Sequence, residues 1–194
     1  GILNKTMAYQ SALDTEIDWR KKVLLMAEHP IQHFFGEQIR NQVLSQVNDV
    51  DSYRVYNADC LTPVDTCSPP ITDPSYQLDT ECNYSSATSR WGQETPGVVS
   101  WFSHGGPTGA IGIFNINNIS GLDEDNGNVV REINDTPAFT FQASCLTAKP
   151  TQSNNLAYEL LKKGGIATIG ATQVAYGPYS AVPMANSGSL IGLA

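Results

Sequence analysis

A histidine and a cysteine stand at the ends of two apolar runs, and these residue types together can supply a nucleophile and its base. The stretch GVVSWFSHGG (97–106) leaves its apolar run at His104, and the stretch PAFTFQASC (137–145) ends at Cys145. A thiol is a good nucleophile near neutral pH when a base takes its proton. A lone cysteine is usually a small buried hydrophobe and a lone His-Gly is usually a turn, so neither residue alone identifies a catalyst. Their matching positions predict a catalytic pair that faces one cleft.

Gly105 and Gly106 follow the histidine directly, where a buried strand must turn into a loop. Glycine permits a sharp turn and a close approach of the backbone to a substrate. A backbone N–H in such a turn can stabilise an oxyanion, which contributes about 3–4 kcal/mol in known cases. The residues after His104 therefore agree with acyl-transfer chemistry.

Buried strands that alternate with amphipathic helices must position these groups. Short apolar runs predict strands at 22–27, 53–57, 98–103, 138–144 and 166–171, and helical spacing predicts helices at 35–48, 87–94 and 153–163. This alternation predicts an α/β fold with a mostly parallel sheet covered on both faces. Such sheets bind ligands at the carboxyl ends of their strands. The polar residues expected at these ends are Glu28, Asp59, His104 and Cys145.

The bulk composition limits the classes of protein that the chain can belong to. It has 194 residues, of which 41% are hydrophobic, and a net charge of −8. This length predicts one domain over residues 1–194 with a sizeable core. The acidic balance argues against a nucleic-acid partner, and no apolar stretch is long enough to span a membrane. A low content of charged residues, 15%, together with many Asn, Ser, Thr and Tyr residues favours a secreted or cell-surface protein.

Three of the four cysteines lie close together in a segment rich in Pro, Asp and Thr, which predicts a long loop insertion over 58–90. They are Cys60, Cys67 and Cys82. A disulfide would brace such a loop in an oxidising compartment, so we expect one pair within this cluster and a free Cys145. A zinc site is the alternative, although the spacing lacks a CxxC unit.

The stretch GLDEDNGN (121–128) places Asp123 and Asp125 close together. Carboxylate oxygens are calcium ligands, but the glycine comes one place too early for an EF-hand loop. The stretch is therefore either a solvated turn or a structural calcium site. We expect no cofactor to be required for activity.

The order of these motifs resembles that of caspase-like cysteine peptidases, and within that group it is most similar to the gingipain family. The similar stretches are WRKKVLLMAE (19–28), GVVSWFSHGG (97–106), PAFTFQASC (137–145) and NLAYELLKKGGIATIGATQVAYG (155–177). They are spread along the chain outside 58–90. The resemblance implies a three-layer α/β/α sandwich and a cysteine endopeptidase that acts on protein or peptide substrates through an acyl-enzyme intermediate.

The resemblance also implies roles for single residues. Cys145 matches the nucleophile and His104 matches the general base. Gly105 matches the glycine that supplies one oxyanion N–H, with the Cys145 N–H as the second donor. Glu28 matches a glutamate that orients the histidine, and a carboxylate there would favour the required imidazole tautomer. For Glu28, a solvated strand end is the alternative.

For the P1 specificity pocket, the resemblance points to an early position in the helix after the first strand. An alignment on Ile39 places this position at Gln38, and a shift of one residue places it at Glu37. Glu37 would bind Arg or Lys, whereas Gln38 would suit a neutral polar side chain. Tyr176 or Tyr179 would form a wall of the pocket. We expect a basic P1 preference.

The sequence also departs from the family pattern. The family's fold continues past the fifth expected strand into another helix and strand, whereas this sequence stops at SGSLIGLA (187–194). A sheet without its last strand exposes an edge. Either the sequence is a truncated piece, or proteolytic processing of a precursor separates the remainder into another chain that stays bound. The exposed edge favours the bound C-terminal fragment. The alternative from another functional class is a caspase-like domain without activity that serves in binding or assembly.

Overall fold

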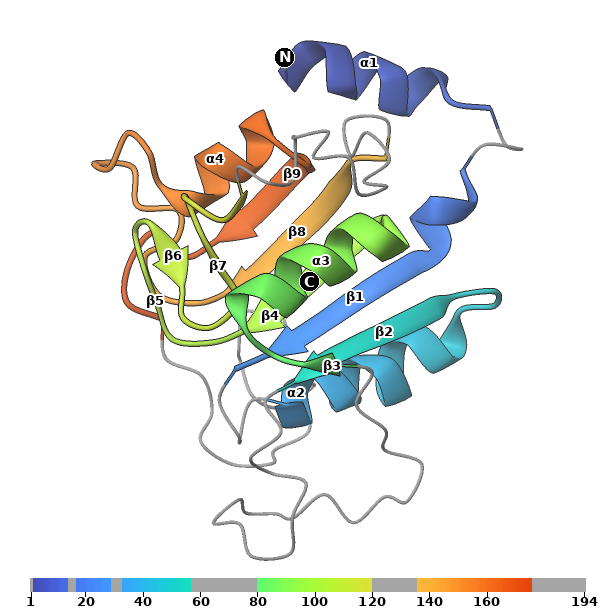
Figure 1. The fold of residues 1–194 in the computed structure, drawn as a ribbon. Coiled ribbons are helices and arrows are strands. Elements are labelled where there is room, and N and C mark those ends of the chain that lie inside the picture. Colours follow the sequence, from blue (N-terminus) through green and yellow to red (C-terminus); the bar gives the residue numbers. More distant parts are fainter. Residues whose placement is uncertain (1, 14–16, 29–32, 57–79, 120–135, 176–194) are drawn as a thin grey trace, which may run out of the picture.

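The fold is an α/β sandwich built on a six-stranded sheet with the order β3-β2-β1-β4-β8-β9 (Figure 1). It is seen in a computed structural model that describes residues 2–13, 17–28, 33–56, 80–119 and 136–175. The strands of this sheet are β1 (Lys22–Ala27), β2 (Asp51–Tyr56), β3 (Thr80–Glu81), β4 (Val98–Phe102), β8 (Ala138–Ala143) and β9 (Gly165–Gly170). Every pair of neighbouring strands in it is parallel. The five expected strands are therefore confirmed, and the two-residue β3 adds a sixth.

The chain enters the sheet at its centre. From β1 it proceeds to β2 and β3 on one side and then returns to β4, β8 and β9 on the other side (Figure 1). The connections after β1 and β4 therefore leave on opposite sides, and α/β sheets bind ligands at the carboxyl ends of the strands at such a point. The topology makes this edge the natural place for a site.

Two apolar clusters cover the two faces of the sheet, because alternate residues of each buried strand point to opposite sides. On one face, Leu24 of β1 and Trp101 of β4 pack with Trp91 and Leu156. The last two come from the helices α3 (Tyr84–Glu94) and α4 (Leu156–Lys162). On the other face, Phe35 from α2 (His33–Gln38) stacks on Phe102 with 5.1 Å between ring centroids. The predicted three-layer sandwich is confirmed.

The helix expected over 35–48 ends at Gln46 and changes its winding along its length. It consists of α2, the π-helical turn η3 (Ile39–Val43) and the 3₁₀ turn η4 (Leu44–Gln46). A π-helical turn is wider than an α-helical turn, so the residues after it rotate away from the sheet. Val43 at the end of this turn and Val47 beyond η4 are about half exposed, at 49% and 53%.

Helix α3 begins at Tyr84, earlier than the expected start at 87. The Asn83 side chain accepts hydrogen bonds from the backbone N–H groups of Ser85 and Ser86, and the Ser86 hydroxyl accepts one from the Asn83 N–H. This capping box fixes the helix start. The last part of the expected 58–90 loop is therefore helical, and residues 57–79 lie outside the described part of the chain.

Several short elements were not predicted. They are helix α1 (Ile2–Ser11), the 3₁₀ turn η2 (Asp18–Lys21) and a small antiparallel sheet of β5 (Gly105–Gly106), β6 (Gly109–Ala110) and β7 (Phe114–Asn115). Tyr9 of α1 makes edge-to-face ring contacts with Trp19 and Phe139. These contacts hold α1 near the start of β8.

Candidate active site

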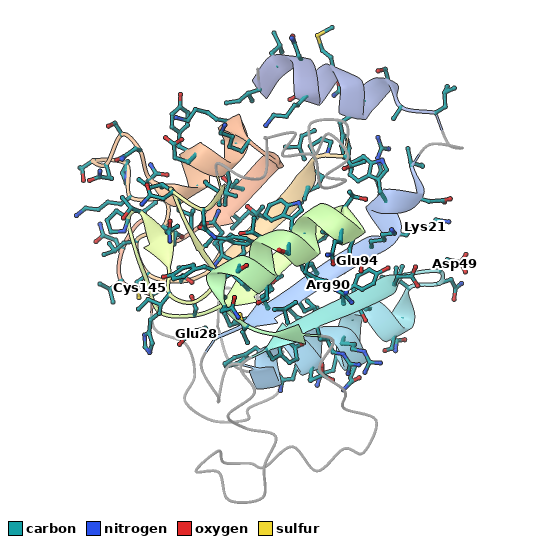
Figure 2. All side chains as sticks on the ribbon, viewed as in Figure 1. Lys21, Glu28, Asp49, Arg90, Glu94 and Cys145 are labelled. Carbon is teal, nitrogen blue, oxygen red and sulfur yellow. The ribbon has the colours of Figure 1, made fainter. Side chains whose placement is uncertain are left out.

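Three of the predicted site residues follow neighbouring strands of the sheet. In the register of β1, β4 and β8, Ala27 lies opposite Phe102, and Phe102 lies opposite Ala143. Glu28 comes directly after the first of these strands and donates its backbone N–H to the Phe102 carbonyl at 3.2 Å. Cys145 comes two residues after β8, and Figure 2 shows it with Glu28 toward the same edge of the sheet. Glu28, His104 and Cys145 thus follow the ends of three neighbouring parallel strands.

The Cys145 thiol is free and partly buried, and it donates a hydrogen bond to the Ala175 carbonyl at 3.4 Å. The next residue, Leu146, has a φ of 61°, which is rare for a residue with a side chain. The Leu146 N–H is bound by the Gln173 carbonyl at 3.1 Å. The turn after β8 is thus held by the segment that follows β9, and this turn directs the sulfur.

His104 comes two residues after β4, and its side chain is exposed. Its backbone carbonyl accepts two hydrogen bonds, from the Ser103 hydroxyl and from the Ile111 N–H, both at 2.8 Å. These bonds fix the backbone of the histidine while its imidazole remains accessible. A general base in a peptidase needs this combination, because it must reach both the thiol and the substrate.

At the first glycine after the histidine, the segment after β4 lies against the segment after β8. A Cβ atom on Gly105 would lie 2.8 Å from the Ser144 Cβ and 2.9 Å from the Cys145 carbonyl oxygen. A Cβ atom on Gly106 would meet nothing within 4 Å. Only the first glycine of the predicted pair is required sterically, and it brings the backbone beside His104 against the backbone of Cys145.

Glu28 depends on a glycine that the sequence analysis did not identify. Gly112 has a φ of +68°, and a Cβ atom there would lie 2.3 Å from the Glu28 Cγ. The Gly112 carbonyl in turn accepts a hydrogen bond from the Cys82 thiol at 3.7 Å. The only signal in the sequence is a single glycine between two isoleucines, which is typical of many turns. The space for the Glu28 side chain therefore becomes visible only in the fold.

The two candidates for the specificity pocket lie in α2. The Glu37 carboxylate accepts a hydrogen bond from the Tyr56 hydroxyl at 3.2 Å and lies 3.6 Å from Arg40 and 3.9 Å from Arg54. Gln38 is buried, with 7% of its surface exposed. Residues of this chain thus already compensate the charge of Glu37.

Other predicted residues lie outside the described part of the chain. They are Tyr176, Tyr179, Asp123, Asp125, Asp59, Cys60 and Cys67. Within the described residues, no group of three or more His, Cys, Asp or Glu side chains could hold a metal ion. No described helix combines the length and the apolar character that a membrane crossing requires. The expected disulfide stays a prediction, since the structure describes only Cys82 of that cluster.

Comparisons with known proteins agree with this geometry. The sequence profile of peptidase family C25 matches residues 1–190. The chain belongs to peptidase family C25. This gingipain family, in clan CD, is a family of cysteine endopeptidases. Among curated proteins, nothing matches the sequence.

A solved structure described as a protease shares the fold of this C25 chain. The two are 17% identical, and the alignment covers 90% of this chain with a TM-score of 0.58. The same alignment covers 34% of the solved chain, so the C25 chain described here spans about a third of the length of that protease.

Proposed function

We propose that this chain hydrolyses peptide bonds with Cys145 as the nucleophile and His104 as the general base. The carrying observation is the register of β4 and β8, which brings the strand ends before these two residues side by side. Family membership supports the same reaction class. Gly105 strengthens the argument, because its missing side chain lets the backbone next to His104 contact the backbone of Cys145.

The proposed reaction has two stages. His104 takes the proton of the Cys145 thiol, the sulfur attacks the scissile carbonyl carbon, and the oxyanion forms near the N–H groups of Gly105 and Cys145. The C–N bond then breaks, and the leaving amine takes the proton from His104. Water, deprotonated by His104, attacks the thioester and releases the acid product and the free thiol. Glu28 is proposed to orient the imidazole through its carboxylate.

The test compares three variants with the wild-type protein on a peptide substrate. Cys145→Ala should abolish turnover, and His104→Ala should lower kcat by at least about 10³-fold, as for other nucleophile–base pairs. Glu28→Gln should cost less, because Glu28 orients the base and does not react. Circular dichroism should show an unchanged fold. Turnover of Cys145→Ala at the wild-type rate would refute the assignment of the nucleophile.

An alkylation experiment separates this proposal from the inactive-domain alternative. Iodoacetamide should label Cys145 quickly at neutral pH, and His104→Ala should slow the labelling, because fewer thiols are ionised without the base. Slow labelling that does not change in His104→Ala would indicate a binding or assembly module instead.

We propose a basic P1 preference as the specificity of this site, based on the resemblance in α2. A P1-scanning peptide library tests it, with Glu37→Gln as the paired variant. If Glu37 binds the P1 cation, Glu37→Gln should remove the preference for Arg and Lys. Glu37 also contacts Arg40 and Arg54, so it could instead stabilise the fold. A basic preference that survives Glu37→Gln, with a lowered unfolding temperature, would assign Glu37 to the stability of α2 and β2 and not to the pocket.

We also propose that a C-terminal segment of the same precursor packs on this chain after processing. In support, β9 lies at the edge of the sheet in the described part of the chain, and Ile169 on this strand is 55% exposed. A secreted or cell-surface location is proposed from the composition. Calcium at Asp123 and Asp125 is proposed as a structural ion only and takes no part in the reaction.

A further inference from the structure

Two buried serines precede the two proposed catalytic residues. Ser103 stands directly before His104 and is 4% exposed, and Ser144 stands directly before Cys145 and is 2% exposed. Their hydroxyl oxygens are 3.1 Å apart, which is a hydrogen-bond distance. The bond connects the ends of β4 and β8 at the point where both strands leave the sheet.

The direction of this bond follows from the donors available. The Ser103 hydroxyl donates its single proton to the His104 carbonyl at 2.8 Å. Ser103 can therefore only accept from Ser144, because a serine hydroxyl has one proton and two acceptor lone pairs. A directed series of hydrogen bonds thus runs from Ser144 through Ser103 to the backbone of His104.

Ser144 also contacts the other side of the histidine. Its Cβ lies where a Cβ on Gly105 would come within 2.8 Å, so the backbone after His104 packs on Ser144. The backbone of β4 is tied to β8 in the same place, because the Ser103 N–H donates to the Ala143 carbonyl at 3.3 Å. Ser144 thus lies against both neighbours of His104, Ser103 through the hydroxyl bond and Gly105 through its backbone.

We propose that Ser103 and Ser144 are a pair of positioning residues that set the placement of the His104 imidazole relative to the Cys145 sulfur. The inference rests on the proposed roles of His104 and Cys145. Proton transfer from a thiol requires the base within hydrogen-bond reach, and a misplacement of about 1 Å can cost about 100-fold in rate. Neither serine touches the substrate in this proposal.

The experiment measures kcat, KM and alkylation for Ser103→Ala and Ser144→Ala. Each should lower kcat by about 10- to 100-fold while KM stays near the wild-type value, since substrate contacts remain. The pH profile of iodoacetamide labelling at Cys145 should move toward that of His104→Ala, because the thiol is less well coupled to its base. A merely structural loss would lower the unfolding temperature without changing this profile.

Ser100→Ala is the matched control. Ser100 lies on β4, the strand that ends just before Ser103, is 5% exposed, and its hydroxyl has no hydrogen-bond partner among the described residues. This variant should retain wild-type kcat and the wild-type labelling profile. Ser103→Thr keeps the hydroxyl and should restore most of the rate that Ser103→Ala loses. It also keeps the test decisive if Ser103→Ala does not fold.

The double variant S103A/S144A tests whether the hydroxyls act as a pair. Removing the second hydroxyl should add little to the loss from the first, because residues in one hydrogen-bond network are not additive. Fully additive losses, or single variants indistinguishable from Ser100→Ala, would overturn the pair. If His104→Ala itself leaves labelling unchanged, the proposed function fails instead, so the two failures are distinguishable.

Discussion

Gly112 shows how a residue without functional groups can determine whether a proposed catalytic residue has room at the strand end. Its backbone has a positive φ, and the space beside it is occupied by the Glu28 side chain. Glu28 in turn is tied to β4 through its N–H and the Phe102 carbonyl. A change at Gly112 must therefore move Glu28 or the loop that follows His104.

Gly112→Ala is expected to lower kcat by about 10- to 100-fold through displacement of Glu28. It should also reduce stability, because an L-residue at this φ costs about 1–2 kcal/mol. The same substitution in a Glu28→Ala background isolates the two effects, since the atom at 2.3 Å is then absent. In the Glu28→Ala background, Gly112→Ala should lower only the stability and should not lower kcat further. Activity assays and thermal unfolding measure both quantities.

Gly106→Ala is the control for this prediction, because its Cβ would enter open space. It should retain wild-type stability and kcat. An equal loss of activity from Gly112→Ala with and without Glu28 would show that Gly112 does not act through Glu28.

The site residues differ in how visible they are in the sequence. The positions of His104 and Cys145 just after two strands could be predicted, because each residue follows an apolar run of strand length. Gly112 and the serine pair could not, because their importance comes from contacts between segments far apart in the chain. Glu37 lies close to where the alignment placed the pocket, but its arginine partners become known only from the fold.

Among the elements, α3 shows how a local signal sets the start of a helix. Asn83 and Ser86 form a reciprocal capping box, and Ala87 and Trp91 then face the core. The Asn118 side chain adds hydrogen bonds to the Tyr84 carbonyl and the Thr88 hydroxyl, which tie the first turn of α3 to the segment after β7. The cap thus supports both the helix and its neighbour.

Asn83→Ala is expected to lower the free energy of unfolding by about 1 kcal/mol, the usual value of an N-cap. For a domain of this size the unfolding temperature should fall by about 2–4 °C. Ser85→Ala is the control, since this exposed residue contributes only its backbone N–H to the cap. Peptidase activity below the unfolding temperature should be unchanged in both variants. An unchanged unfolding temperature in Asn83→Ala would show that the cap does not limit stability.

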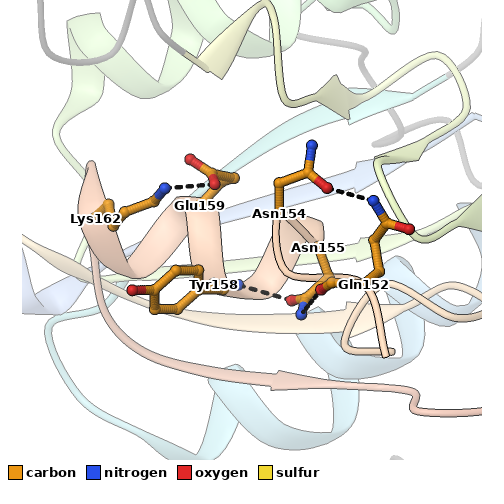
Figure 3. Close-up of polar contacts among 6 residues, drawn as sticks. All are labelled: Gln152, Asn154, Asn155, Tyr158, Glu159 and Lys162. Atoms are coloured by element: carbon orange, nitrogen blue, oxygen red, sulfur yellow. Dashed lines mark hydrogen bonds and ion pairs between the residues drawn. The ribbon is translucent and has the colours of Figure 1, made fainter. Parts of the chain in front are cut away.

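A second local network shows the same logic at helix α4. The Asn155 side chain accepts the Tyr158 N–H at 3.0 Å and donates to the Gln152 carbonyl at 2.9 Å (Figure 3). The helix was predicted over 153–163 and lies at Leu156–Lys162, so its cap lies two residues after the predicted start. Several capping residues in a row make this choice impossible from sequence alone.

Other elements escape sequence reasoning for different physical reasons. The π-helical turn of η3 keeps the helical pattern of its sequence but changes which residues face the sheet. Helix α1 has no marked apolar face, and its contacts are made by Tyr9 and by the buried Lys5, which binds the Leu161 carbonyl at 2.6 Å. The strands β5 to β7 have two residues each, which is too short for any periodicity.

At the scale of the whole molecule, the parallel sheet could be predicted because its central strands are apolar on both faces. β1 is almost entirely buried, and helices cover its two sides. The coverage is uneven, however. Phe139 on β8 is 44% exposed and Ile169 on β9 is 55% exposed, and both belong to the face opposite α4. This exposed apolar pair is where the proposed C-terminal segment of the precursor would pack.

Ile169→Asp in the complete precursor should therefore abolish copurification of the C-terminal segment after processing, because a carboxylate cannot be buried there without a partner. Tyr158→Asp is the control, since Tyr158 is 46% exposed on α4, on the other face of the sheet. It should copurify as the wild-type protein does. Native mass spectrometry measures which species is present. A mass of two copies of this chain would show that a second copy, and not the precursor segment, covers this surface. Copurification of the segment with Ile169→Asp at the wild-type level would show that the segment binds elsewhere.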